Sequence, residues 1–330
     1  MKDNKIRYSK LLYSVAKLML LFFFILLISI SSIYYQISKV FINRAYKDDV
    51  IKVSSLFSKE MVGEEVTFKS LEGNLNLKGI YFPAKIESNK TIILVHGFNE
   101  SRLMSGRTKK IVEYLTPLGY NVFTFDLRGH GQSEGDIVSF GYYEKYDVMG
   151  AVNYLKNRGK VADKIALLGF SMGAIASIEA AGQDPRIDII IADSPARDLE
   201  LFISNDLKNI SSNLDHILKN LDADQYYTVL KYLPFKEKAI FWAAKLYGIN
   251  VSKVSPMNTV KNITKQPLLL IHGKSDRFIS YTNSEEIFKL SNNKFITEIW
   301  ITDNTDHIQS LNMYPVEYLG KIKSFLSKHM

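Results

Sequence analysis

The chain has 330 residues, of which 46% are hydrophobic and 23% are charged, and its formal net charge is +8. This length and composition predict one large α/β domain with a short additional segment and argue against a disordered chain. The absence of cysteine excludes disulfides, thiolate catalysis and cysteine-ligated metal sites. No block rich in Lys and Arg is interleaved with aromatic residues, so we expect no nucleic-acid partner.

An uncharged and strongly apolar run occupies residues 18–38. As a helix rising 1.5 Å per residue it would extend about 30 Å, which is the thickness of the hydrocarbon core of a bilayer. The run is longer than the apolar region of a signal peptide, and Tyr34 and Tyr35 lie where an interfacial aromatic belt is expected. We therefore predict a retained transmembrane helix, with a cleaved signal peptide as the alternative.

The charge on either side of this run predicts its orientation. Residues 1–17 hold five basic side chains against one acidic side chain, so half of the net charge lies before the run ends. Because basic flanks stay in the cytoplasm, we predict a cytoplasmic tail over residues 1–17 and an extracytoplasmic body. We expect a linker over residues 39–63 and a folded domain over residues 64–330.

The predicted domain opens with two alternating segments, residues 64–70 and 74–84, which are typical of an antiparallel hairpin at a sheet edge. Short apolar and β-branched runs then alternate with helical stretches. Such runs are typical of strands buried on both faces, and together they predict a mostly parallel sheet with helices on both faces. The runs lie at residues 91–97, 121–126, 164–169, 187–194, 267–273 and 297–302.

Residues 197–262 interrupt this alternation with aromatic-rich helical sequence and contain no strand pattern. We predict that this segment is a helical cap inserted over one end of the sheet. Its aromatic side chains are expected to form local core more often than ligand contacts; they are Tyr226, Tyr227, Tyr232, Phe235, Phe241 and Trp242.

The sequence Gly-Phe-Ser-Met-Gly at residues 169–173 is a weak motif by itself, since chance can produce a G-x-S-x-G. Its context is more specific, because it follows a predicted buried strand and opens a helix of small residues. This strand-turn-helix setting predicts a nucleophile elbow with Ser171 at its apex. Glycine is needed at 169 and 173 because side chains there would collide with the neighbouring strand and helix.

A serine hydroxyl needs an adjacent base, and the base needs an orienting carboxylate. His307 follows the last predicted strand and Asp276 follows the strand before it, so both fall at the edge where open α/β sheets bind ligands. We predict His307 as the base and Asp276 as its partner, with Asp303 and the adjacent Asp306 as rival carboxylates.

Negative charge on the substrate oxygen requires preorganised donors. We predict that the backbone N–H groups of Met172 and Phe98 form the oxyanion hole, one after the nucleophile and one in the loop after the strand at 91–97. His96 and Gly97 are expected to shape that loop rather than react.

These motifs resemble those of the α/β-hydrolases of the serine aminopeptidase-like and lysophospholipase (monoglyceride lipase)-like group, and more narrowly its single-pass bacterial members. The resemblance extends from about residue 66 to residue 328 and is specific for the fold and the triad, but not for the substrate. In such relatives the segment at 126–135 is a structural loop, so His130 is not expected to react. A departure from the group is Asp306, which replaces a common glycine before the histidine. The motifs are HGF (96–98), DLRGHGQSEG (126–135), GFSMG (169–173), DSP (193–195), HGKSD (272–276) and DH (306–307).

The predicted activity is hydrolysis of a small-molecule or lipid carboxylic ester through an acyl-enzyme on Ser171, without a metal or cofactor. Peptide or amide cleavage, or acyl transfer, by the same triad is one alternative. A non-catalytic membrane-anchored binding module is the other.

Overall fold

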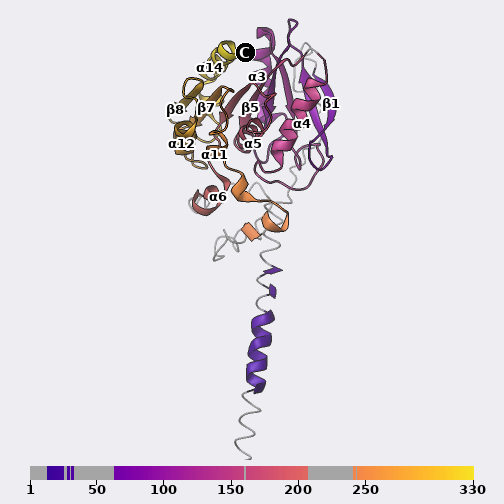
Figure 1. The fold of residues 1–330 in the computed structure, drawn as a ribbon, viewed down its shortest axis with the longest axis vertical. Helices are drawn as coiled ribbons and strands as arrows, with labels where there is room; N and C mark the ends of the chain where they lie inside the picture. The colour runs from indigo at the N-terminus through magenta and orange to yellow at the C-terminus, as the bar shows by residue number, and fades with distance from the viewer. Residues whose placement is uncertain are drawn as a thin grey trace, which may run out of the picture.

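The computed structural model describes residues 13–25, 28–29, 31–32, 63–159, 161–206, 241–242 and 244–330 (Figure 1). The described residues before position 33 are helical and their side chains are exposed. Within the described part of the chain, every helix is too short or too polar to cross a membrane. The remainder of the predicted segment 18–38, the tail at 1–12 and almost all of the predicted linker lie outside the described residues. The membrane helix therefore stays a prediction.

An eight-stranded sheet, ordered β1-β2-β4-β3-β5-β6-β7-β8, forms the centre of the domain (Figure 1). β3 to β8 run parallel, whereas β1 pairs with β2 and β2 with β4 in antiparallel register. The predicted parallel sheet and the predicted hairpin are both confirmed. The strands are β1 (Glu64–Lys69), β2 (Asn76–Phe82), β3 (Lys90–Val95), β4 (Asn121–Phe125), β5 (Lys164–Phe170), β6 (Ile189–Asp193), β7 (Leu268–Gly273) and β8 (Thr297–Thr302).

Helices cover both faces of the sheet, which explains why the central strands are apolar along their whole length. One apolar cluster lies between the sheet and α4, α5 and α12, and a second lies between the sheet and α3 and α14. The helices are α3 (Arg107–Leu115), α4 (Glu144–Lys156), α5 (Met172–Ala181), α6 (Leu199–Leu201), α11 (Pro256–Thr259), α12 (Thr282–Leu290), α13 (Ser310–Met313) and α14 (Pro315–His329).

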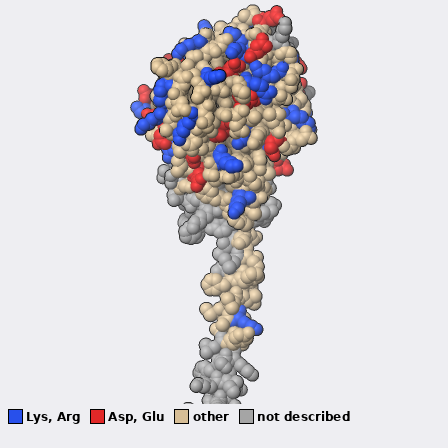
Figure 2. All heavy atoms as spheres, viewed as in Figure 1, with Lys and Arg blue, Asp and Glu red and all other residues tan. Residues whose placement is uncertain are grey.

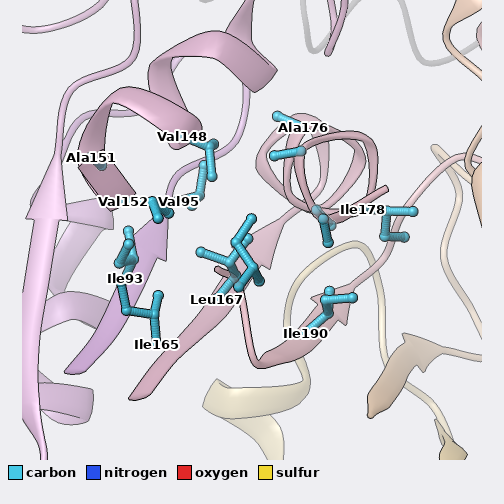
Figure 3. Close-up of a cluster of buried hydrophobic side chains, with 14 of the residues drawn as sticks. Ile93, Val95, Val148, Ala151, Val152, Ile165, Leu167, Ala176, Ile178 and Ile190 are labelled. Carbon is cyan, nitrogen blue, oxygen red and sulfur yellow. The ribbon is translucent and has the colours of Figure 1, made fainter. Parts of the chain in front are cut away.

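Figure 3 shows the first cluster, where β-branched and leucine side chains of the central strands meet small side chains of α5. Leu167 of β5 lies next to Ile190 of β6, and Ala176 and Ile178 of α5 pack above them. These side chains are fully buried. The small residues after Ser171 let α5 pack close to the sheet, so the start of the helix is fixed next to Ser171.

The two ends of the predicted cap are described, and they lie side by side. Leu199 N donates to Val254 O at 2.9 Å, and Met257 N donates to Arg197 O at 2.9 Å. The outgoing chain contains α6 and one π-helical turn, Phe202–Asp206, while the returning chain contains the 3-10 turn Val251–Lys253 and α11. Residues 207–240 lie outside the described residues, so the cap bounds 197–262 remain a prediction.

Charged side chains of both signs are interspersed over the face of the described domain shown in Figure 2. The edge strand β8 contributes Glu298, which forms ion pairs with Lys321 at 3.1 Å and Lys328 at 3.0 Å.

Candidate active site

Ser171 occupies a sharp turn between β5 and α5. Its backbone has φ 53° and ψ −116°, a conformation that is rare for a residue with a side chain. The turn is held because Ser171 N donates to the carbonyl of Asp193, at the end of neighbouring β6, at 2.8 Å. The serine therefore lies at the carboxyl end of the sheet with its side chain turned away from the strand.

The glycines that flank this turn are required by close backbone approach. A Cβ at Gly173 would lie 2.2 Å from the carbonyl oxygen of Val95 in β3, and a Cβ at Gly169 would lie 2.4 Å from the carbonyl oxygen of Gly173. Neither distance is physically accessible, so the predicted reason for the two glycines is confirmed.

The structure brings the three predicted side chains together in one hydrogen-bonded chain. His307, in the loop after β8, has Nε2 at 2.8 Å from Ser171 Oγ. Its Nδ1 lies 2.6 Å from Oδ2 of Asp276, in the loop after β7. A carboxylate only accepts hydrogen bonds, so Nδ1 carries the proton and Nε2 is free to accept from the serine hydroxyl.

The environment favours the ionised form of the Asp276 carboxylate and raises the basicity of the His307 imidazole. Burial alone would raise the pKa of Asp276, but the nearby His307 and His272 outweigh burial and hold that pKa below its ordinary value. Burial alone would lower the pKa of His307, but the carboxylates of Asp276, Asp193 and Glu100 outweigh burial and raise that pKa. An imidazolium formed during reaction would thus be stabilised.

His272 also contacts Asp276, and the sequence analysis did not assign it to the site. Its Nε2 lies 2.8 Å from the carbonyl of Ile279 and 3.2 Å from Asp276 Oδ2, while Nδ1 lies 2.7 Å from the hydroxyl of Ser284. The Asp276 Oδ1 atom accepts from the backbone N–H groups of Phe278 and Ile279 at 2.8 and 2.9 Å. Both carboxylate oxygens of Asp276 are therefore held in place. In the sequence, the four-residue spacing between His272 and Asp276 was the signal that could have predicted their contact.

The rival carboxylates have other partners. Asp306 accepts from Arg277 Nε at 2.7 Å and from His307 N at 2.8 Å, so it ties two loops together instead of facing the imidazole. Asp303 is mostly exposed and lies 3.4 Å from Lys274 Nζ. Geometry favours Asp276 over both.

The loop after β3 borders the serine. A Cβ on Gly97 would lie 3.3 Å from the Ser171 Cβ, so this loop passes directly beside Ser171. The next residue along the chain is Phe98, whose N–H is the first of the two predicted oxyanion donors. Met172 supplies the second predicted N–H at the start of α5. His96 is fully buried, with Nδ1 at 2.7 Å from Gly97 O and Nε2 accepting from Leu127 N at 2.9 Å, which agrees with its predicted role in shaping the loop.

The loop at 126–135 has a different character. Arg128 is bound by Asp147 of α4 at 2.8 Å, by Glu72 at 2.6 Å and by the Ser70 hydroxyl at 3.0 Å. We call Arg128, Asp147, Glu72 and Ser70 the Arg128 cluster. His130 is buried nearby, with Nδ1 at 2.9 Å from the Arg128 carbonyl oxygen.

Apolar side chains border Ser171 and His307. The ring of Phe278 lies 5.4 Å from the His307 ring, and the ring of Phe98 lies 5.2 Å from that of Phe140. Phe278 and Phe241 both pack against a buried cluster that includes Ile203. One predicted cap aromatic, Phe241, therefore contributes to local core, while Trp242 is 45% exposed. The other four predicted cap aromatics lie outside the described residues. Among described side chains, no group of three or more His, Asp or Glu could hold a metal ion.

Known proteins are similar to this chain in sequence and in architecture. Residues 86–234 match the profile of the hydrolase family described as serine aminopeptidase, S33. The chain is 29% identical over 253 residues to the uncharacterised protein YqkD of Bacillus subtilis, covering 76% of this chain and 75% of that protein. It is 27% identical over 210 residues to the phospholipase YtpA of the same organism, covering 58% and 77%. The esterase Pf2001 of Pyrococcus furiosus superposes with a TM-score of 0.66 at 26% identity, covering 88% of this chain and 98% of that one.

The sheet topology and these similarities define the architecture: the chain has the α/β-hydrolase fold. Its relatives include an esterase and a phospholipase, and the arrangement at the carboxyl edge of its sheet is suited to acyl chemistry.

Proposed function

We propose that this protein is a serine hydrolase that cleaves carboxylic esters. The observation that carries the proposal is the unbroken chain from the strained Ser171 through His307 to Asp276, with contacts of 2.8 and 2.6 Å. A hydroxyl without such a base is a poor nucleophile at neutral pH.

In the proposed reaction, Ser171 Oγ attacks the ester carbonyl carbon and its proton passes to His307 Nε2. The N–H groups of Phe98 and Met172 stabilise the oxyanion, and the N-terminal end of α5 adds its dipole. His307 then gives the proton to the departing alcohol, leaving an acyl-Ser171. Water, deprotonated by His307, attacks this acyl group and releases the acid, and the proton returns to Ser171.

The substrate proposed is an ester with an apolar acyl group. Support comes from the aromatic side chains beside the reacting groups, above all Phe278 next to His307. The esterase and the phospholipase among the similar proteins point in the same direction.

A membrane anchor at residues 18–38, with the catalytic domain outside the cytoplasm, is a further part of the proposal and rests on the uncharged run and its basic flank. Protease added to intact cells should degrade the domain and spare residues 1–17. Protection of the domain in intact cells and its degradation after lysis would contradict this orientation.

The activity is tested with the full-length chain on p-nitrophenyl acyl esters and aminoacyl anilides, together with a fluorophosphonate probe. We expect ester turnover and labelling in the wild type, and a loss of kcat of at least about 10⁴-fold with no labelling in Ser171→Ala. Faster turnover of the anilides would favour a peptidase, and neither turnover nor labelling would favour the binding module.

Ser194 offers a matched control. It lies at the end of the neighbouring strand β6 with a similar positive φ of 57°, but its hydroxyl donates to Asp193 at 2.9 Å instead of contacting a histidine. Ser194→Ala should remain labelled and active. Labelling that persists in Ser171→Ala would overturn the assignment of the nucleophile.

A further inference from the structure

Glu100 is a nearly buried carboxylate in the loop that would supply an oxyanion donor. It follows Phe98 by two residues, and its side chain is only 15% exposed. Its Oε2 atom accepts a hydrogen bond from Gly97 N at 3.0 Å. The Glu100 carboxylate therefore fixes the backbone N–H of Gly97, which directly precedes the N–H of Phe98 along the chain.

Arg107, the first residue of α3, holds the other oxygen of Glu100. Its Nη2 atom binds Glu100 Oε1, and the side chain is 5% exposed. A buried guanidinium paired with a nearly buried carboxylate keeps both side chains in defined positions, since either charge alone would be costly to bury.

Arg107 also reaches the two other segments that carry reacting groups. Its guanidinium carbon lies 4.9 Å from the ring centroid of Phe170, the residue before Ser171. Its Nη1 atom lies 3.5 Å from the carbonyl oxygen of Ile308, the residue after His307, at the long end of the hydrogen-bonding range. One side chain thus borders the oxyanion loop, the nucleophile turn and the histidine loop.

All three segments contain strained backbone. Asn99 has φ 56°, Ser171 has φ 53° and Ile308 has φ 50°, and the last is β-branched, for which a positive φ is a genuine outlier. Such conformations persist only where surrounding contacts over-determine them. Glu100 and Arg107 supply contacts of this kind at the point where the segments meet.

We propose that Glu100 and Arg107 form a positioning pair that sets the geometry of the oxyanion loop and of the His307 loop around Ser171. The proposal rests on the function proposed above. Neither side chain is assigned a contact with substrate: Glu100 acts through the Gly97 N–H, and Arg107 acts through Glu100, Phe170 and Ile308.

The Glu100 carboxylate has a second consequence that a purely structural residue would lack. Burial opposes protonation of His307, and Asp276, Asp193 and Glu100 favour it, so the pKa of His307 is raised. Removing the Glu100 charge should lower the pKa of the base. The acidic limb of kcat/KM would then move to lower pH, because the base must be neutral to accept the serine proton.

The test compares Glu100→Gln with the wild type in the full-length chain, measuring kcat and KM for a p-nitrophenyl ester across pH and the melting temperature. Loss of one oxyanion donor costs about 10²–10³-fold in kcat, and a misplaced donor should cost about 10–100-fold with KM nearly unchanged. The acidic limb should shift to lower pH. Glu113→Gln is the matched control on α3, because Glu113 is 44% exposed and pairs only with Lys109 at 3.8 Å among the described residues.

Glu100→Gln leaves the Arg107 charge without its partner, so the double variant Glu100→Gln/Arg107→Met removes both charges together. It should fold and still show the reduced kcat. An unchanged kcat in folded Glu100→Gln, an acidic limb that does not move, or loss of folding in both variants would overturn the positioning role. These outcomes differ from failure of the proposed function, in which the wild type itself would be inactive and unlabelled.

Discussion

Two polar networks in this domain end differently: one is the triad chain of Ser171, His307 and Asp276, and the other is the Arg128 cluster, of which only Glu72 is substantially exposed. In the Arg128 cluster the guanidinium is bound by two carboxylates and a hydroxyl, and the network closes on itself. The triad chain ends instead on a serine hydroxyl held by a strained turn. Substitutions in the Arg128 cluster, where every charge has a partner, should lower the free energy of unfolding. Substitutions in the triad chain, which ends on a hydroxyl that can react, should lower kcat.

The largest effect is expected for Asp276→Asn. The new NH₂ group would donate to His307 Nδ1, which would leave the proton on Nε2 and prevent that atom from accepting the serine proton. We expect a loss of kcat of about 10⁴-fold, measured by ester turnover, with the fold retained in circular dichroism. Asp147→Asn in the Arg128 cluster is the control, and it should lower the melting temperature while kcat per folded molecule stays near the wild-type value. Comparable losses of kcat in the two variants would remove the distinction.

A smaller effect, on stability alone, is expected for Arg128→Ala. This change leaves Asp147 buried without its cation and should lower the free energy of unfolding by about 3–5 kcal/mol. Urea denaturation measures it. Arg158→Ala breaks the more exposed pair with Glu64 and should cost no more than about 1 kcal/mol. Equal costs at the two sites would show that closure of the buried network is not what stabilises it.

Glu179 tests whether a buried carboxylate on the helix after the proposed nucleophile affects activity or only stability. It lies on α5, the helix that begins after Ser171, but its oxygens accept from Ser255 N at 2.9 Å and Thr259 Oγ1 at 3.0 Å where the cap returns. Burial raises its pKa to about 7. Those two hydrogen bonds and the nearby Lys145 lower the pKa, and the Asp198 charge raises it further.

The sign of the pH effect follows from that shift. The folded state holds the Glu179 proton more tightly than the unfolded chain, so its contribution to stability is complete below about pH 4.5 and is lost as the pH rises through about 7. Glu179→Gln retains both hydrogen bonds without the charge. Relative to the wild type, the variant should gain up to about 3 kcal/mol between these pH values, seen as a rising difference in melting temperature. A constant difference across this range would contradict the prediction, and kcat should change little.

Several parts of the molecule could be predicted from sequence because their causes are local. Apolar runs predicted strands of the parallel sheet, and the strand-turn-helix setting predicted the turn at Ser171 and its need for Gly169 and Gly173. Asp276 and His307 could be proposed because the carboxyl ends of parallel strands meet at one edge. The contact of His272 with Asp276, and the contacts of Glu100 and Arg107, were missed because they depend on how separate loops meet.

By itself, the sequence determined where strands and helices follow one another along the chain, since periodicity and turn chemistry depend on neighbouring residues. It also determined which polar residues follow each strand at the carboxyl edge of the sheet. Only the tertiary structure decided between Asp276, Asp303 and Asp306, because a hydrogen bond to His307 depends on side-chain direction within about an ångström. The same holds for Arg107, which lies 201 residues from Ile308 along the chain yet contacts its carbonyl. Distances between loops are set by the packing of the whole sheet and its helices, so they cannot be predicted from a local sequence pattern.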